Sequence, residues 1–218
     1  MESTALIAHV AIVAVPLLAA VVCHEVAHGA VALACGDDTA KRAGRLTLNP
    51  LPHIDPVGTI VLPALLLLAP LILGSPPFLF GYAKPVPVDP SRFRRPRRDA
   101  VAVAIAGPGT NLLLAAASAL VLGWIPADVV EGSPTFWLGM MAAASIRVNC
   151  LLAVFNLLPV PPLDGGRVLT TLLPQRGARL AQSLEGVGMV LVLLAVLNTP
   201  LLSVLVRPLV AFFFRMAQ

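Results

Sequence analysis

The residues with the clearest capacity for chemistry are His24, Glu25 and His28, which form a His-Glu-x-x-His sequence near the end of the first apolar stretch. On an α-helix, residues i and i+4 share a face about 6 Å apart in rise, so both imidazoles can face one metal ion. Glu25 can then lie against an attacking water and take its proton. The alternative is a pair of core histidines satisfied by hydrogen bonds.

The setting of this motif favours the metal site. Three ionisable side chains within five residues of a membrane-spanning helix cost several kcal/mol unless they face a polar interior and bind something. A catalytic zinc site also needs a third protein ligand and an open fourth position. Soluble zinc proteases place that ligand shortly downstream, where this chain has Val31, Ala34 and, in a loop, Asp37 and Asp38. We therefore expect a distant third ligand.

Asp164 is the outstanding distant candidate. It follows an apolar stretch directly, on backbone that the three prolines of residues 159–162 exclude from regular helix. Irregular backbone at membrane depth must be buried in protein or line a wet cavity, and a metal site provides that setting. Taken alone, Asp164 could instead cap a helix at the membrane exit. With His24 and His28 it makes a donor set that suits zinc best.

The composition places these residues in a membrane protein. Of the 218 residues, 58% are hydrophobic and 12% charged, and the mean hydropathy is +0.89, which is too apolar for a soluble domain. We expect an all-α polytopic membrane protein with four to six transmembrane helices. It should form a single domain over 1–218, with its core at 5–170 and a C-terminal helical segment at 187–214. The stretches long enough to span are 6–33, 57–73, 100–122, 136–158 and 187–214.

The charged residues indicate a lipid environment. The net charge of +4 is weak evidence for nucleic acid, because the basic residues lie in loops beside apolar stretches, and we expect no nucleic-acid partner. The basic run 92–98 should meet anionic lipid of the bilayer. Arg147 falls inside an apolar stretch and should face the protein interior or water. The sequence leaves the oligomeric state unknown.

Together the two segments resemble the site-2 protease family of intramembrane zinc metalloproteases. The resemblance rests on the residues 24–28, on the N-x-x-P-x-P-x-L-D-G pattern of residues 156–165, and on the stretches 44–56, 81–88 and 106–111. It spans most of residues 20–170 and is similar to the small bacterial and archaeal members. We expect this small form, without PDZ or CBS domains.

The resemblance implies a zinc metalloendopeptidase in which His24, His28 and Asp164 bind one zinc ion and Glu25 is the general base. Its substrates would be transmembrane protein segments, cleaved in or near the bilayer in regulated intramembrane proteolysis. The competing hypothesis is a membrane metal transporter or another metal-binding membrane protein. Transport would need further acidic or histidine ligands along a path, and it would not need a base beside them.

Further roles follow from the same resemblance. Asn156 would help to hold an extended substrate backbone, and Asn111 is a second candidate for substrate binding. His53 could contact a metal ligand or bind the metal transiently, or it could be a turn residue before Asp55-Pro56. Residues 44–48 could form a short membrane-associated β-strand or hairpin edge that accepts an extended substrate, or an ordinary loop.

The loop charges predict an orientation. Basic residues occupy 36–56, 75–99 and 159–186, whereas the loop after residue 122 carries only Asp128 and Glu131. The positive-inside rule puts the basic loops in the cytosol. Because Asp164 follows its apolar stretch at that side, the active site should face the cytosol and the N-terminus should lie outside. The resemblance to bacterial and archaeal members implies a multi-pass protein of a prokaryotic cell membrane. Because basic loops flank 57–73, that stretch should turn back as a re-entrant hairpin, with Pro63 and Pro70 as breakers. One oblique full span is the alternative.

Overall fold

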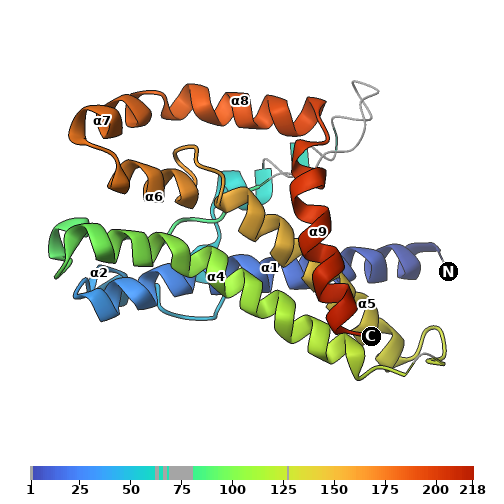
Figure 1. The fold of residues 1–218 in the computed structure, drawn as a ribbon. Helices are drawn as coiled ribbons and strands as arrows, with labels where there is room; N and C mark the ends of the chain where they lie inside the picture. The colour runs from blue at the N-terminus through green and yellow to red at the C-terminus, as the bar shows by residue number, and fades with distance from the viewer. Residues whose placement is uncertain (1, 62–63, 66–67, 69–80, 127) are drawn as a thin grey trace.

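The computed structural model describes residues 2–61, 64–65, 68, 81–126 and 128–218, shown in colour in Figure 1. These residues form helices and loops and include no β-strand, which confirms the all-α prediction. Three of the described helices are long and apolar enough to cross a membrane. They are α1 (Glu2–Cys35, with its span at 11–35), α4 (Pro96–Gly123) and α5 (Pro134–Asn156). Most of the predicted 57–73 stretch lies outside the described residues.

Caps and prolines set the helix ends more sharply than hydropathy does. The Ser133 hydroxyl accepts a hydrogen bond of 3.1 Å from the Phe136 N–H, and Pro134 occupies the first position of α5. Proline is well suited there, because the N–H that it lacks would have no partner within the helix. Helix α4 likewise begins at a proline, Pro96. Both helices therefore begin before the apolar stretches that predict them.

The three long helices form an antiparallel bundle in which α4 runs opposite to α1 and α5 (Figure 1). Asn111 of α4 donates to the Ala20 carbonyl of α1, whereas Val103, earlier in α4, accepts from His28, later in α1. The end of α1 and the start of α4 consequently lie at the same end of the bundle. The predicted re-entrant hairpin and its alternative, a single full span, both concern 57–73, which lies mostly outside the described residues.

The chain segments at that end of the bundle contact one another directly. The Arg94 N–H donates to the Cys35 carbonyl at 3.1 Å, and the Lys84 N–H donates to the His53 carbonyl at 2.9 Å. Residues 44–48 are an irregular loop, so of the two predictions for them the loop is the one observed. The short elements here are α2 (Thr39–Arg42), η1 (Leu51–His53), the π-helical η2 (Pro56–Val61) and η3 (Pro90–Arg92).

The C-terminal part begins with two short helices and ends with two longer ones. These are α6 (Asp164–Leu172), α7 (Gln175–Ser183), α8 (Glu185–Asn198) and α9 (Leu201–Met216). The predicted segment 187–214 is thus two helices, divided at Thr199-Pro200, whereas Pro208 lies inside α9. Helix α9 packs on α4 and α5 (Figure 1). The Arg147 side chain is exposed, so it does not face the protein interior, and its guanidinium lies over the Phe214 ring of α9, 5.1 Å from the ring centroid.

Packing inside the bundle uses small residues, and apolar side chains also cover its outside. Leu113 is 72% exposed and Leu120 is 57% exposed on α4. Such a surface is costly in water and suits contact with lipid. The main buried cluster between α4, α5 and α9 comprises Ala115, Ala119, Ile146, Cys150 and Phe213.

Candidate active site

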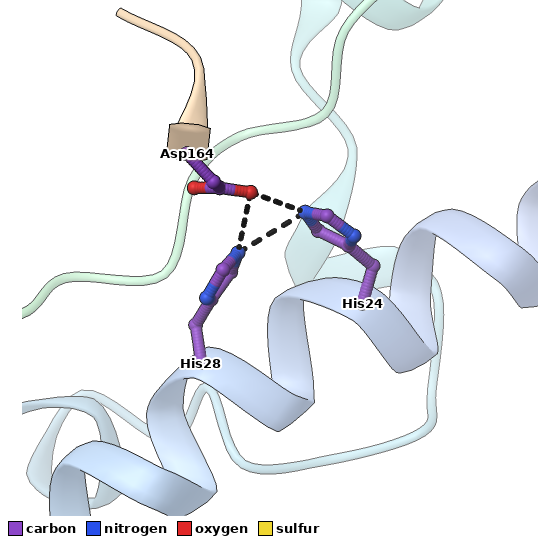
Figure 2. A group of neighbouring side chains, drawn as sticks. All are labelled: His24, His28 and Asp164. Carbon is purple, nitrogen blue, oxygen red and sulfur yellow. Dashed lines mark hydrogen bonds and ion pairs between the residues drawn. The ribbon is translucent and has the colours of Figure 1, made fainter. Parts of the chain in front are cut away.

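His24 and His28 lie one turn apart on the buried face of α1, as Figure 2 shows. Their Nε2 atoms are 3.1 Å apart, and the two rings are nearly perpendicular, at 86°. The spacing in the sequence therefore produces the predicted convergence of the two imidazoles.

Asp164 reaches the same point from the distant end of the chain. It is the first residue of α6, and the irregular segment 157–163 carries it back over α1 (Figure 2). Its Oδ2 atom lies 3.2 Å from His24 Nε2 and 3.3 Å from His28 Nε2. Each of the three residues is less than a tenth exposed. The structure thus brings together the three side chains that the sequence predicts as a group.

Two glycines allow this approach. A Cβ atom on Gly165 would lie 2.3 Å from the Leu157 carbonyl oxygen, and one on Gly166 would lie 2.3 Å from the Pro161 nitrogen. Both obstacles are backbone atoms, which cannot rotate aside. The start of α6 can pack against the preceding segment only because these positions lack side chains, and this packing fixes the position of Asp164.

Hydrogen bonds on the far side of each imidazole decide where its proton lies. His28 Nδ1 is 2.7 Å from the Val103 carbonyl oxygen, and His24 Nδ1 is 2.6 Å from Asn111 Oδ1. Both partners are acceptors, so each Nδ1 carries the proton of a neutral ring. Each Nε2 then presents a lone pair toward Asp164 Oδ2, which is buried and has no hydrogen-bond donor. Three facing electron donors without a proton between them call for a cation.

The geometry of these donors fits zinc. Tetrahedral zinc with ligand bonds of about 2.0–2.1 Å holds its donors roughly 3.3 Å apart, and the three separations here are 3.1, 3.2 and 3.3 Å. Two neutral nitrogens and one carboxylate oxygen leave one position of a tetrahedron open, as a catalytic site requires. His24, His28 and Asp164 can therefore hold one metal ion.

Gly107 of α4 lies beside this metal position. A Cβ atom there would be 2.5 Å from His28 Nε2 and 2.6 Å from His24 Nε2. Even an alanine would thus displace the two atoms that face Asp164. The missing side chain leaves room for the imidazoles where α4 crosses α1.

The charge of Asp164 is set by opposing effects. Burial alone would raise the pKa of this carboxyl group, but hydrogen bonds from the two imidazoles, when these carry a proton on Nε2, outweigh burial and hold the pKa below its ordinary value. A bound cation would take the place of those protons. The other carboxylate oxygen, Oδ1, lies 3.7 Å from Arg167 Nη1. Asp164 is therefore available as the anion that a metal ligand must be.

Glu25 lies beside the histidines but bonds elsewhere. Its Oε2 atom accepts a hydrogen bond of 2.7 Å from the backbone N–H of Val86, in the non-helical segment 81–89. The half-buried carboxylate is thereby attached to a chain segment 61 residues away. Gly29 allows that segment to approach α1, because a Cβ there would lie 2.9 Å from Val86 Cγ1.

The other predicted site residues lie outside the group of three. Asn111 is fully buried with its amide bonded on both sides, which leaves no surface for the substrate contact predicted for it. Asn156, the last residue of α5, is half-buried and donates to the Leu152 carbonyl. His53 is buried, and its Nε2 bonds to the Thr47 carbonyl at 2.9 Å, as a residue that closes the 47–53 loop would.

Several residues of the site have no side chain that indicates chemistry, although Gly107 and Val86 lie in stretches that carry the family resemblance. Gly107 acts through the absence of a side chain. Val103 contributes its backbone carbonyl and Val86 its backbone N–H. Every residue type has that carbonyl, and every type except proline has that N–H. Asn149 extends the contacts of Asn111, and as an isolated amide within an apolar stretch it could have been found. The group formed by His24, His28 and Asp164 is the one cluster of this kind in the described part of the chain.

Known proteins match this chain along most of its length. The model of peptidase family M50 matches residues 125–197, which contain Asp164 and the segment before it. The YwhC protein of Bacillus subtilis, provisionally named a zinc metalloprotease, is 40% identical over 196 residues, which are 89% of this chain and 83% of YwhC. Rip2 of Mycolicibacterium smegmatis, with the same provisional description, is 32% identical over 88% of this chain and 68% of its own length. No solved structure matches.

A helical membrane protein that gathers two imidazoles and a carboxylate, with a glutamate beside them, belongs to the class of membrane metalloproteases. The chain is a member of peptidase family M50, the site-2 protease family of zinc metalloproteases. The two relatives named above are bacterial, in agreement with the predicted prokaryotic origin. Family membership also favours the protease over the metal transporter.

Proposed function

We propose that this protein hydrolyses peptide bonds in or near transmembrane segments of other membrane proteins. The observation that carries the proposal is the convergence of His24, His28 and Asp164 within 3.3 Å of one another inside an apolar helical bundle. These three residues would hold the zinc ion. Glu25, one residue after the first ligand, would act as the general base.

The chain's own residues divide the chemistry between them. Zinc, when bound, supplies Lewis acidity that polarises the scissile carbonyl and makes an attacking water more acidic. Glu25 accepts a proton from that water and delivers it to the leaving nitrogen. Water thus adds across the C–N bond, which breaks to give a carboxylate and an amine, and no residue of the enzyme bonds covalently to the substrate.

The substrate must reach the site in an extended form. A helical segment keeps its amides in internal hydrogen bonds, so a spanning helix has to unwind before its carbonyls can be attacked. We assign the contact with this extended backbone to Asn156, which is half-buried at the end of α5, directly before the segment that carries Asp164. The apolar setting of the site suits a transmembrane segment as substrate. Contacts with the side chains of the extended substrate would determine which proteins are cleaved.

The site would open toward the cytosol. His28, Asp164 and the basic loops lie toward the same end of the bundle, and the loop with Asp128 and Glu131 lies at the other. The positive-inside rule assigns the basic end to the cytosol. Water for hydrolysis would then come from that side.

The test compares wild type with Glu25→Gln in vesicles that contain single-span membrane proteins. Both should hold one zinc ion per chain, and Glu25→Gln should cleave about 10²–10⁴-fold more slowly. Glu185→Gln, an exposed position on α8, is the matched control and should behave as wild type. Equal cleavage by Glu25→Gln would remove this residue from the mechanism. Zinc flux across the vesicles without cleavage would support the transporter instead.

A further inference from the structure

A series of buried and half-buried polar side chains leads away from His24 across all three long helices. It runs through Asn111 of α4, Asn149 and Ser145 of α5, and then back to Ser118 of α4. Asn111 is 0% exposed and Asn149 is 1% exposed. An amide buried in an apolar bundle costs free energy unless its hydrogen bonds are made, so this series must be ordered.

The orientation of the Asn149 side-chain amide is fixed by its contact with Ser145. The Asn149 Nδ2 atom lies 2.9 Å from the Ser145 carbonyl oxygen. A backbone carbonyl can only accept, which identifies the facing atom of Asn149 as its NH₂ group. The other end of the same amide, Oδ1, therefore faces Asn111 Nδ2, at 2.9 Å.

The orientation of Asn149 determines the orientation of Asn111 and, through it, the proton position on His24. Asn111 Nδ2 donates to Asn149 Oδ1, and it also donates to the Ala20 carbonyl at 3.3 Å. Asn111 Oδ1 must then be the atom that faces His24 Nδ1, at 2.6 Å. Because that oxygen only accepts, the proton of His24 lies on Nδ1, and Nε2 keeps its lone pair toward Asp164 Oδ2.

Both histidines carry their proton on Nδ1, but the group that accepts this proton differs between them. His28 donates directly to a backbone carbonyl, that of Val103, which no side-chain substitution removes. His24 depends on an amide that would present a donor instead of an acceptor if it turned over. A flipped Asn111 would place the His24 proton on Nε2 and take away one metal ligand.

We propose that Asn111 and Asn149 are positioning residues, which keep the His24 proton on Nδ1 and thereby set the affinity of the site for zinc. The inference rests on the proposed function, because it concerns a ligand of the same metal. It gives Asn111 a role other than substrate binding, and it gives a role to Asn149, three contacts away from Asp164.

Zinc affinity of the purified protein, measured by competition with a chelator, tests the proposal. Asn111→Leu keeps the volume and should weaken zinc binding about 10–100-fold, as loss of a partner of a ligating histidine does. Asn149→Leu should weaken zinc binding less, by about tenfold. Because Asn149 acts through Asn111, the double variant should bind zinc no more weakly than Asn111→Leu. Ser118→Ala leaves the Ser145 carbonyl in place and is the control, with unchanged affinity.

Nitrogen NMR of histidine-labelled protein supplies a second readout, since the chain has only four histidines. In zinc-free wild type above pH 8, His24 should carry its proton on Nδ1, whereas Asn149→Leu should populate the Nε2–H form. Should Asn149→Leu fail to fold, Asn149→Ala serves in its place. An unchanged proton position, or zinc affinities of the two single variants that add in the double variant, overturns the inference. Zinc binding that survives loss of His24 itself contradicts the proposed function and leaves the NMR test intact.

Discussion

The backbone N–H of Val86 donates a hydrogen bond of 2.7 Å to the Glu25 carboxylate and so attaches the proposed base to a loop outside its own helix. Val86 lies between Pro85 and Pro87. Its backbone is therefore held extended, and its N–H is the one donor between Lys84 and Val88. The loop and the base thus form one unit.

Removing this N–H should lower activity without releasing zinc. Val86→Pro suits the extended backbone and keeps an apolar side chain, so it chiefly deletes the donor. Loss of a hydrogen bond to a charged group, worth about 1.5–3 kcal/mol, should slow cleavage about 10–100-fold, because each 1.4 kcal/mol is a factor of ten. Val86→Ala keeps the N–H and is the control. Equal cleavage rates for the two variants would show that this bond does not position Glu25.

Gly107 should be needed for zinc binding rather than for folding. Gly107→Ala introduces a Cβ within 2.6 Å of both Nε2 atoms and should weaken zinc binding about tenfold or more. Gly109→Ala on the same helix is the matched control, since its Cβ would meet nothing within 4 Å. Both changes favour the helix by up to about 1 kcal/mol. Chelator competition and thermal unfolding separate the two effects, and equal zinc affinities would contradict this role.

The topology predicts which loops share a face of the membrane. Cysteines introduced by Lys41→Cys and Arg97→Cys should react with an impermeant maleimide from the same side, and Glu131→Cys from the opposite side. All three positions are exposed. The positive-inside rule further places the first two in the cytosol. Labelling of positions 41 and 97 from opposite faces would be incompatible with the antiparallel packing of α1 and α4.

Asp37 should make stability depend on pH where α1 ends. Burial raises the pKa of this carboxyl group, but hydrogen bonds from Thr39 and from the Asp89 N–H outweigh burial, so the pKa lies below its ordinary value of 3.8. The ionised form therefore stabilises the fold above that pH, and the contribution disappears as the pH falls below it. The folded protein is the state that binds this proton less readily.

The measurement is thermal unfolding in detergent between pH 7 and pH 2.5. Asp37→Asn should be less stable than wild type at pH 7, by about 1.5–3 kcal/mol, and the difference should shrink below pH 3.8. The neighbouring Asp38 is exposed in its ion pairs with Arg42 and Arg92. Asp38→Asn should therefore cost no more than about 1 kcal/mol. A difference for Asp37→Asn that stays constant with pH would contradict the assignment.

The sequence predicts the chemistry of the site better than its surroundings. His24, Glu25 and His28 are fixed by helical periodicity, and the prolines and glycines around Asp164 mark a remote carboxylate that directly follows an apolar stretch. Gly107 and Val86 contribute through contacts between helices and loops distant in sequence. Such contacts leave no periodic pattern, so they become visible only when α4 and residues 81–89 are seen against α1.

In the fold, too, the sequence predicts some features and not others. Hydropathy predicts the cores of α1, α4 and α5, because lipid requires long apolar helices. Hydropathy does not predict that the last stretch breaks at Pro200 and continues through Pro208. Both residues are prolines, and they differ only in their position relative to the start of α9. The role of Asn111 likewise depended on burial, which its place in an apolar stretch left open.

The zinc dissociation constant of Asp164→Ala, relative to wild type and to Asp38→Ala, tests the central claim most directly. The remote carboxylate should be the third ligand, so wild type and Asp38→Ala should each bind one zinc ion with the same affinity, and Asp164→Ala should bind at least about 100-fold more weakly. Zinc held equally tightly by Asp164→Ala would mean that His24 and His28 do not share their metal with this residue.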